Sequence, residues 1–192
     1  MLQKQTRHYT PAEYLALEDE ADHKSEYFEG EIFAMAGGST NHNIIAGNVY
    51  ALLNQAVADE PCIAFTSDVK ILVKENGLYT YPDAMVVCGQ LEYAEGRTDT
   101  ITNPILIVEV LSKSTRSYDR DKKFELYRAL KSLQDYILVD QERVYIEYYH
   151  KLEDGRWILT LFNRSDTDLT LTTIKASLPI SRIYHKVDWS AP

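Results

Sequence analysis

The sequence predicts a single α/β or α+β domain built on a mixed β-sheet. The first observation is length, because 192 residues suit one domain. The second is composition, because 45% hydrophobic and 26% charged residues are ordinary for a soluble globular protein. The third is pattern, because helix, hairpin, helix, strands, helix and strands follow one another along the chain.

The first third of the chain carries clear local signals. Thr10 suits a helix N-cap and Glu13 completes a capping box, so a helix is expected to begin here. The stretch "SEYFEGEIFAMAGG" predicts two short strands that meet at Glu29 and Gly30, as in a hairpin. Apolar residues then recur at helical spacing, which predicts an amphipathic helix over residues 40–57.

The remainder of the chain is richer in strands. "CIAFTSDVKILVK", the turn "ENG" and "LYTYPDAMVVC" predict two or three strands, and residues 91–103 predict a polar loop. "ILIVEVLS" and "DYILVD" are typical of buried strands, with a helix between them over "RSYDRDKKFELYRALKS". "RVYIEYYHKLEDGRWILTLFN" predicts a hairpin that turns at "EDG", and "LTLTTI" a last short strand.

We therefore expect one domain over residues 1–192, in three parts. An N-terminal helix and hairpin occupy residues 9–37, a core about 40–140, and a C-terminal hairpin and tail 141–192. No segment approaches 18 consecutive apolar residues, so we expect no membrane span. The start "MLQKQTRHYT" lacks the apolar stretch of a secretion signal, so a cytoplasmic location is expected.

Two further features of composition limit the function. Cys62 and Cys88 are too few for a disulfide framework or a zinc site, so we expect small hydrophobic side chains in a reducing compartment. The net charge of −9 argues against a protein that coats nucleic acid without specificity. It leaves room for a local basic patch beside an acidic, metal-binding cleft.

Three carboxylates lie inside or beside strand-like stretches. Glu109 interrupts the apolar run "ILIVEVLS", where an unpaired carboxylate costs several kcal/mol, roughly. A basic partner, a metal ion or exposure at a strand end must offset that cost. Asp83 follows Pro82 at a bend before "AMVV", and Asp68 lies in "FTSDVKI". Mg²⁺ and Mn²⁺ prefer oxygen ligands, so acids on adjacent strands are candidates to share one ion; the alternative is solvation or pairing with Lys or Arg.

The helix after the Glu109 strand supplies candidate cations. On a helix, Asp119, Lys123 and Tyr127 share one stripe, whereas Lys122 points about 100° away. A lysine above the strand end could hold a water molecule or neutralise developing negative charge. The alternative is an exposed Asp119–Lys123 pair, and periodicity alone does not choose between Lys122 and Lys123.

Other charged residues of this region suit a polyanionic substrate. The candidates for a basic rim beside the site, or for an ordinary solvated helix start, are Lys113, Arg116, Arg120 and Lys122. His42, in "STNHNII", either lines the same pocket or serves as a local cap or exposed residue.

The order of "YPDAMVV", "ILIVEVLSKSTRSYDRDKKFELYRAL" and "DYILVD" resembles the Uma-type family of restriction-endonuclease-like proteins, within the PD-(D/E)XK nuclease superfamily. "SEYFEGEIFAMAGGSTNHN" and "TSDVKI" extend the resemblance over most of the chain. It implies a restriction-endonuclease-like mixed β-sheet flanked by helices. It also implies Asp83 and Glu109 as ligands of a divalent ion, with Asp68 and Glu26 as further candidates. The superfamily lysine two residues after the glutamate is leucine here, and the helix lysine that replaces it in the Uma-type pattern matches Lys123.

The resemblance implies Mg²⁺- or Mn²⁺-dependent hydrolysis of DNA phosphodiesters by Asp83, Glu109 and Lys123, with Tyr127 holding the lysine or the water in place. Two alternatives are a catalytically silent binding or scaffold module, and a metal-dependent hydrolase with another substrate. By analogy, a homodimer would suit the cutting of both strands of a duplex.

Overall fold

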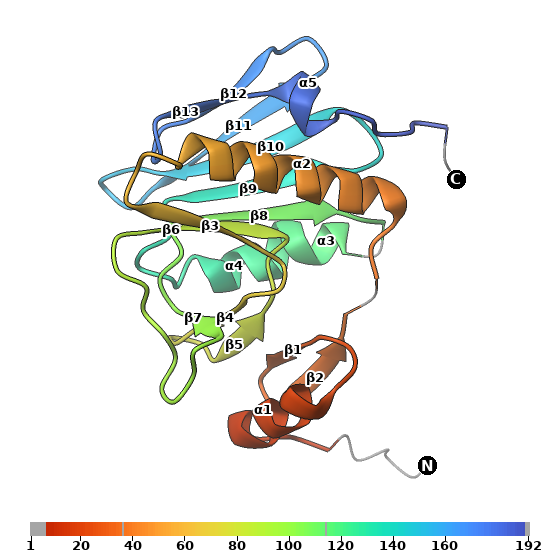
Figure 1. Cartoon of the computed structure of the whole chain (residues 1–192). Coiled ribbons are helices and arrows are strands. Elements are labelled where there is room, and N and C mark those ends of the chain that lie inside the picture. The colour runs from red at the N-terminus through yellow and green to blue at the C-terminus, as the bar shows by residue number, and fades with distance from the viewer. Residues whose placement is uncertain (1–6, 36, 114, 191–192) are drawn as a thin grey trace.

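The structure is a computed structural model that describes residues 7–35, 37–113 and 115–190. Its centre is a six-stranded mixed sheet with helices on both faces (Figure 1). This confirms the predicted fold class, although three sheets are present rather than one. No helix among the described residues has the length and apolar character needed to cross a bilayer.

The strands form sheets of six, five and two members. The six-stranded sheet has the order β11 (Trp157–Asn163), β10 (Tyr145–Lys151), β9 (Asp135–Asp140), β8 (Leu106–Leu111), β6 (Ala84–Cys88) and β3 (Cys62–Thr66). The five-stranded sheet has the order β2 (Glu31–Ala34), β1 (Ser25–Phe28), β5 (Leu78–Thr80), β4 (Lys70–Val73) and β7 (Thr100–Ile101). Strands β12 (Asp168–Leu171) and β13 (Ala176–Pro179) form the smallest sheet.

The helical segments are short apart from two. They are α1 (Pro11–Glu20), α2 (Thr40–Ala56), α3 (Arg116–Tyr118), the π-helical segment η1 (Asp119–Lys123), α4 (Phe124–Tyr127) and α5 (Ile180–Ile183). Helix α1 begins with the predicted capping box between Thr10 and Glu13. The predicted hairpin is also confirmed, and its turn residues Glu29 and Gly30 both have positive φ, as a two-residue hairpin turn requires.

Strand β8 lies at the middle of the large sheet. It pairs in parallel with β9 and antiparallel with β6, and all six of its residues are buried. Its side chains alternate between two separate apolar clusters on the two faces of the sheet. The predicted buried strands at "ILIVEVLS" and "DYILVD" are therefore confirmed.

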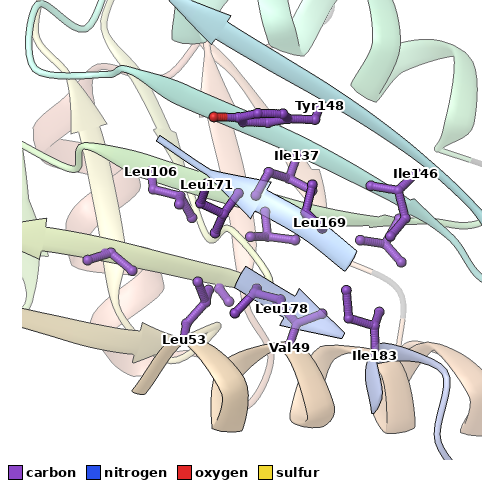
Figure 2. Packing of buried hydrophobic residues seen from close by; sticks show 14 of the residues in the cluster. Val49, Leu53, Leu106, Ile137, Ile146, Tyr148, Leu169, Leu171, Leu178 and Ile183 are labelled. Atoms are coloured by element: carbon purple, nitrogen blue, oxygen red, sulfur yellow. The ribbon is translucent and has the colours of Figure 1, made fainter. Parts of the chain in front are cut away.

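One face of the large sheet packs against α2, β12, β13 and α5. Figure 2 shows Val49 and Leu53 of α2 facing Leu169, Leu171 and Leu178 of the two-stranded sheet and the strands beyond. The opposite face carries Met85, Ile107 and Leu111, which pack against the segment 116–130 and the inner side of the five-stranded sheet. The helix that follows β8 is thereby held across the end of its own strand.

Several boundaries differ from the predictions. The region 62–88 contains four strands rather than two or three, and β7 lies inside the predicted loop 91–103. The predicted helix after β8 is divided into α3, η1 and α4. The C-terminal tail contributes β13 and α5, because its alternating apolar residues complete the core above α2.

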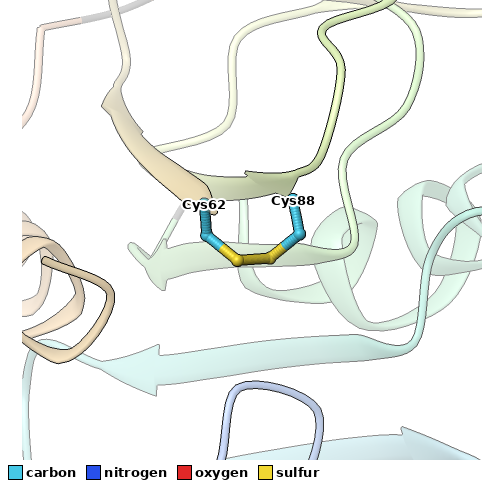
Figure 3. The surroundings of a disulfide bond; sticks show 2 residues. All are labelled: Cys62 and Cys88. Carbon is cyan, nitrogen blue, oxygen red and sulfur yellow. A yellow bond between two sulfur atoms is a disulfide. The ribbon is translucent and has the colours of Figure 1, made fainter. Parts of the chain in front are cut away.

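The expectation for the two cysteines is wrong. Cys62 and Cys88 form a disulfide between β3 and β6 (Figure 3). They are direct cross-strand partners in the antiparallel register, which brings the two side chains together. The bond joins the edge strand of the large sheet to its neighbour.

Candidate active site

The pairing of β6 with β8 brings two predicted acids together. Ala84 pairs with Val108, so one further step in the antiparallel register places Asp83 opposite Glu109. The two carboxylates lie on the face that also carries Met85 and Ile107. The backbone N–H of Val110 donates a 2.7 Å hydrogen bond to Asp83 Oδ2. The backbone of β8 therefore holds the Asp83 carboxylate beside Glu109.

Lys123 is the basic partner that the buried position of Glu109 requires. Its Nζ lies 3.0 Å from Glu109 Oε1 and 2.8 Å from Glu26 Oε1. The side chains of all three residues are buried. Lys122 instead points outward and pairs with Glu125, so the structure places Lys123 at the site.

The segment formed by η1 and α4 brings further groups to the same point. Asp119 Oδ1 lies 3.8 Å from Lys123 Nζ, and the Tyr127 hydroxyl donates a 2.7 Å hydrogen bond to Glu109 Oε1. The Tyr136 hydroxyl of β9 donates to the backbone carbonyl of Asp119, which fixes η1 against the sheet. Single π-helical turns are frequent at functional sites, where they adjust the direction of side chains.

Glu26 reaches the site from the N-terminal hairpin. Besides the Lys123 ammonium, its Oε1 accepts a 2.5 Å hydrogen bond from Thr80 Oγ1 of β5. The pairing of β1 with β5 through Tyr27 and Tyr79 holds the hairpin in this position. One lysine thus joins the hairpin to the central sheet through two carboxylates.

His42 approaches Asp83 from the start of α2. The Ser39 hydroxyl caps this helix by accepting a hydrogen bond from the His42 backbone N–H. His42 Nε2 lies 3.3 Å from Asp83 Oδ2. Burial lowers the pKa of His42, but the hydrogen bond to Asp83 and the charge of that carboxylate outweigh it, so the net shift is upward.

Burial dominates the electrostatics of the site. It raises the pKa of Glu109 to about 8, against the opposing effect of the Lys123 charge. It also raises the pKa of Asp119. Burial disfavours the charged form of Lys123, yet the carboxylates around it, with Glu109 the strongest, hold its pKa well above the usual range. The acids around Lys123 therefore favour its charged form.

These groups open into one large cleft of about 1220 Å³. Its described lining includes six carboxylates against three lysines. The acids are Glu26, Asp83, Glu109, Asp119, Glu142 and Asp188, and the lysines are Lys24, Lys113 and Lys123. The cleft lining is therefore acidic. Lys123, its most buried lysine, is already paired with Glu26 and Glu109.

Asp68 does not join this group. Its side chain is 83% exposed and forms an ion pair with Lys24. It is not among the described residues that line the cleft. Asp68 lies in the turn between β3 and β4.

The four cations predicted as a basic rim are all paired with acids. Arg116 contacts Asp140 and Glu142, and Arg120 contacts Glu147. Lys113 contacts Glu142, and Lys122 contacts Glu125. Of the four, only Lys113 is among the described residues that line the cleft. The structure therefore does not assemble the expected basic rim at this position.

Sequence reasoning missed several residues of the cleft, among them the exposed aromatic residues Phe33, Tyr118 and Trp189. It also missed Thr80, which donates a hydrogen bond to Glu26 from outside the described cleft lining. The predicted hairpin turn already held the signal for Phe33, because a turn at Glu29 and Gly30 pairs Phe33 with Glu26.

Comparison with known proteins gives consistent results. The family model described as "Uma2: Putative restriction endonuclease" matches residues 11–181. Two uncharacterized proteins of Synechocystis are similar to this chain. Protein sll1609 is 37% identical, with 88% of this chain and 96% of its own length covered, and slr1290 is 41% identical, with 91% and 90% covered.

A solved structure shares the fold. The crystal structure of a "putative nuclease" from Anabaena variabilis matches with a TM-score of 0.74 at 20% identity, over 91% of this chain and 97% of that one. The fold agrees with the family match, which spans most of the chain. The chain therefore belongs to the Uma2 family, described as "Putative restriction endonuclease".

Proposed function

We propose that this protein is a Mg²⁺- or Mn²⁺-dependent nuclease that hydrolyses phosphodiester bonds of DNA. The observation that carries the proposal is the buried Lys123, held by Glu109 and Glu26 next to Asp83 in an open acidic cleft. Burying Lys123, Glu109, Glu26 and Asp119 at one point is costly for stability. Such a cluster is typical of a catalytic site.

The donor set fits a magnesium-type ion. Among the described residues, no group of three or more His, Cys, Asp or Glu is arranged to hold an ion. Mg²⁺, however, is usually bound by one or two carboxylates, with water and substrate phosphate completing its shell. Asp83 and Glu109 would be those two ligands. A bound divalent ion would polarise the phosphate and lower the pKa of a water molecule.

The chain's own residues would prepare the site for this chemistry. Lys123, whose charged form the surrounding acids favour, would neutralise the charge that develops on the phosphate as water attacks phosphorus and the sugar oxygen leaves. Tyr127 holds Glu109 through its hydroxyl, and the Val110 N–H holds Asp83. Excess negative charge in the cleft would repel DNA without a divalent ion, which is a further reason to expect metal dependence.

The test is cleavage of plasmid and oligonucleotide DNA by purified protein with Mg²⁺, with Mn²⁺ and with chelator. We expect cleavage only with metal, and its loss in Asp83→Asn, Glu109→Gln and Lys123→Met. Asp68→Asn is the matched control and should keep full activity, because Asp68 lies outside the cleft lining. Protein that cuts no form of DNA with either metal would contradict the proposal.

A second candidate is a binding or scaffold module that keeps the fold without catalysis. It is favoured by the two carboxylates that already hold Lys123, and by the pairing of all four predicted rim cations. Titration calorimetry with Mn²⁺ separates the two candidates. The nuclease should bind the ion and lose binding in Asp83→Asn, whereas a silent module should bind none.

The homodimer and the cytoplasmic location stay predictions. If a second copy pairs with this chain, the strand most suited to the contact is β11, which forms an edge of the large sheet and has exposed Ile158, Leu159 and Leu161. Light scattering of wild type and Leu161→Lys tests this arrangement. A monomeric wild type would exclude it.

A further inference from the structure

We propose, resting on the nuclease function above, that the cleft takes single-stranded DNA in preference to duplex DNA. The unpaired bases would stack on three aromatic side chains at the cleft, Phe33, Tyr118 and Trp189. The inference depends on the positions of these rings and on the distribution of charge around them.

The three rings are exposed although each belongs to the cleft lining. Phe33 is 47% exposed, Tyr118 36% and Trp189 43%. They come from β2, α3 and the segment after α5, which are far apart in the chain. Large aromatic side chains left in contact with water around one concave surface are typical of a binding site.

Each ring belongs to a segment that is joined to one carrying a residue of the site. Phe33 is the cross-strand partner of Glu26, and Tyr118 directly precedes Asp119 in the chain. Trp189 follows Asp188, whose backbone N–H and carbonyl form hydrogen bonds of 3.1 and 2.7 Å with the Asn41 side-chain amide. That pair of bonds fastens the C-terminal segment to the start of α2, next to His42. Bases stacked on these rings would lie in the same cleft as Lys123 and Glu109.

The charge of the cleft disfavours a duplex. Duplex DNA carries about one negative charge per 1.7 Å of axis, and a single strand about one per 3.4 Å. Duplex-binding proteins meet this charge with lysines and arginines. Here the cleft lining has twice as many carboxylates as lysines. Arg116 and Arg120 are outside the described lining and are already paired with acids. A single strand is repelled less, and it alone exposes the faces of its bases.

Stacking supplies the affinity that phosphate contacts do not. A base stacked on an aromatic side chain strengthens binding by about 5- to 150-fold, whatever the base. The preference should therefore be for strand state rather than for sequence. The cleft lining combines an acidic cluster with three exposed aromatic side chains.

The experiment measures binding and cleavage separately. A labelled single strand, its duplex, and an abasic strand of equal length are titrated with full-length protein in Ca²⁺, followed by fluorescence anisotropy. Cleavage of the same three molecules is then measured in Mn²⁺. We expect the single strand to bind at least about tenfold more tightly than either the duplex or the abasic strand.

The variants test the role of the rings. Phe33→Leu and Tyr118→Leu should each weaken binding of the single strand about tenfold and leave binding of the abasic strand unchanged. Phe33→Tyr keeps a ring and should restore affinity. Tyr93→Leu is the matched control, because Tyr93 is an exposed aromatic residue outside the described cleft lining. Equal thermal stability of the variants excludes an effect on folding.

Each outcome bears on one of the two proposals. A single strand that binds through the rings but is not cut would keep this inference and overturn the nuclease function. A duplex that is cut while single strands are neither bound nor cut would do the opposite. Equal binding of normal and abasic strands, or full affinity in Phe33→Leu and Tyr118→Leu, would overturn the stacking role.

Discussion

The backbone N–H of Val110 donates a hydrogen bond to the carboxylate of Asp83, with 2.7 Å between the nitrogen and Oδ2. Val110 directly follows Glu109, so the bond fixes one acid relative to the other through the backbone of β8. A site that depends on two carboxylates at a constant separation needs such support, because a side chain alone would be mobile. His42 contacts the same oxygen from the other side.

His42 is expected to position Asp83 for metal binding. In His42→Ala the carboxylate loses one of its two described contacts, and Mn²⁺ affinity should fall about 10- to 100-fold. Calorimetric titration with Mn²⁺ measures the change. His23→Ala is the control, because His23 lines the cleft and has no described contact with Asp83. Equal affinities of His42→Ala and wild type would contradict the role.

Replacing Lys123 should destabilise the protein strongly. Above pH 8, where Glu109 is ionised, Lys123→Met leaves Glu26 and Glu109 buried without their cation, and loss of one partner of a buried pair costs about 3–5 kcal/mol. Lys122→Met is the matched control at an exposed pair, worth about 0–1 kcal/mol. Urea unfolding of metal-free protein measures both. A similar free energy of unfolding for the two variants would contradict the buried pairing.

Glu109 should make the stability of metal-free protein fall as pH rises. Its pKa is about 8 in the folded protein and 4.5 in the unfolded reference, so between these values the folded state binds more protons than the unfolded state. Glu109→Gln removes this dependence. In chelator, the variant should match wild type near pH 5 and melt at a higher temperature at pH 8. A lower melting temperature than wild type at pH 8 would contradict the expected pKa.

The disulfide should contribute to stability without affecting the site. Cys62 and Cys88 are 26 residues apart, and a cross-link closing a loop of this size stabilises by about 3 kcal/mol. The bond joins Cys62, where β3 begins, to Cys88, where β6 ends, so it lies at the end of the pair opposite Asp83. Reduction, or the double change Cys62→Ser and Cys88→Ser, should lower the melting temperature while Mn²⁺ affinity stays constant. Unchanged melting on reduction would contradict this.

Local pattern was enough for much of the fold. The capping box of α1, the hairpin turn at Glu29 and Gly30, and the buried strands β8 and β9 follow from residues near one another in the chain. Glu109 was identifiable because a carboxylate in an apolar run needs a partner. The division of the helix after β8 was not predictable, because the π-helical turn depends on tertiary contacts such as the bond from Tyr136 to Asp119.

The partners of charged residues were beyond the reach of sequence spacing. Asp68 and Asp83 have similar local contexts, yet one faces solvent and the other the cleft, because only Asp83 continues a strand paired with β8. Arg116 pairs with an acid of β9 and Arg120 with an acid of β10, and neither pairing can be read from spacing along the chain. The disulfide likewise needs the register of β3 against β6, which neither strand determines alone.

The most direct test of the account is a crystal soaked in Mn²⁺ and measured at a wavelength where manganese scatters anomalously. We predict one strong anomalous peak bridging the carboxylates of Asp83 and Glu109, absent from Asp83→Asn and retained in Asp68→Asn. No peak at these two residues, or a peak that survives in Asp83→Asn, would contradict the claim that neighbouring strands hold a catalytic metal ion here.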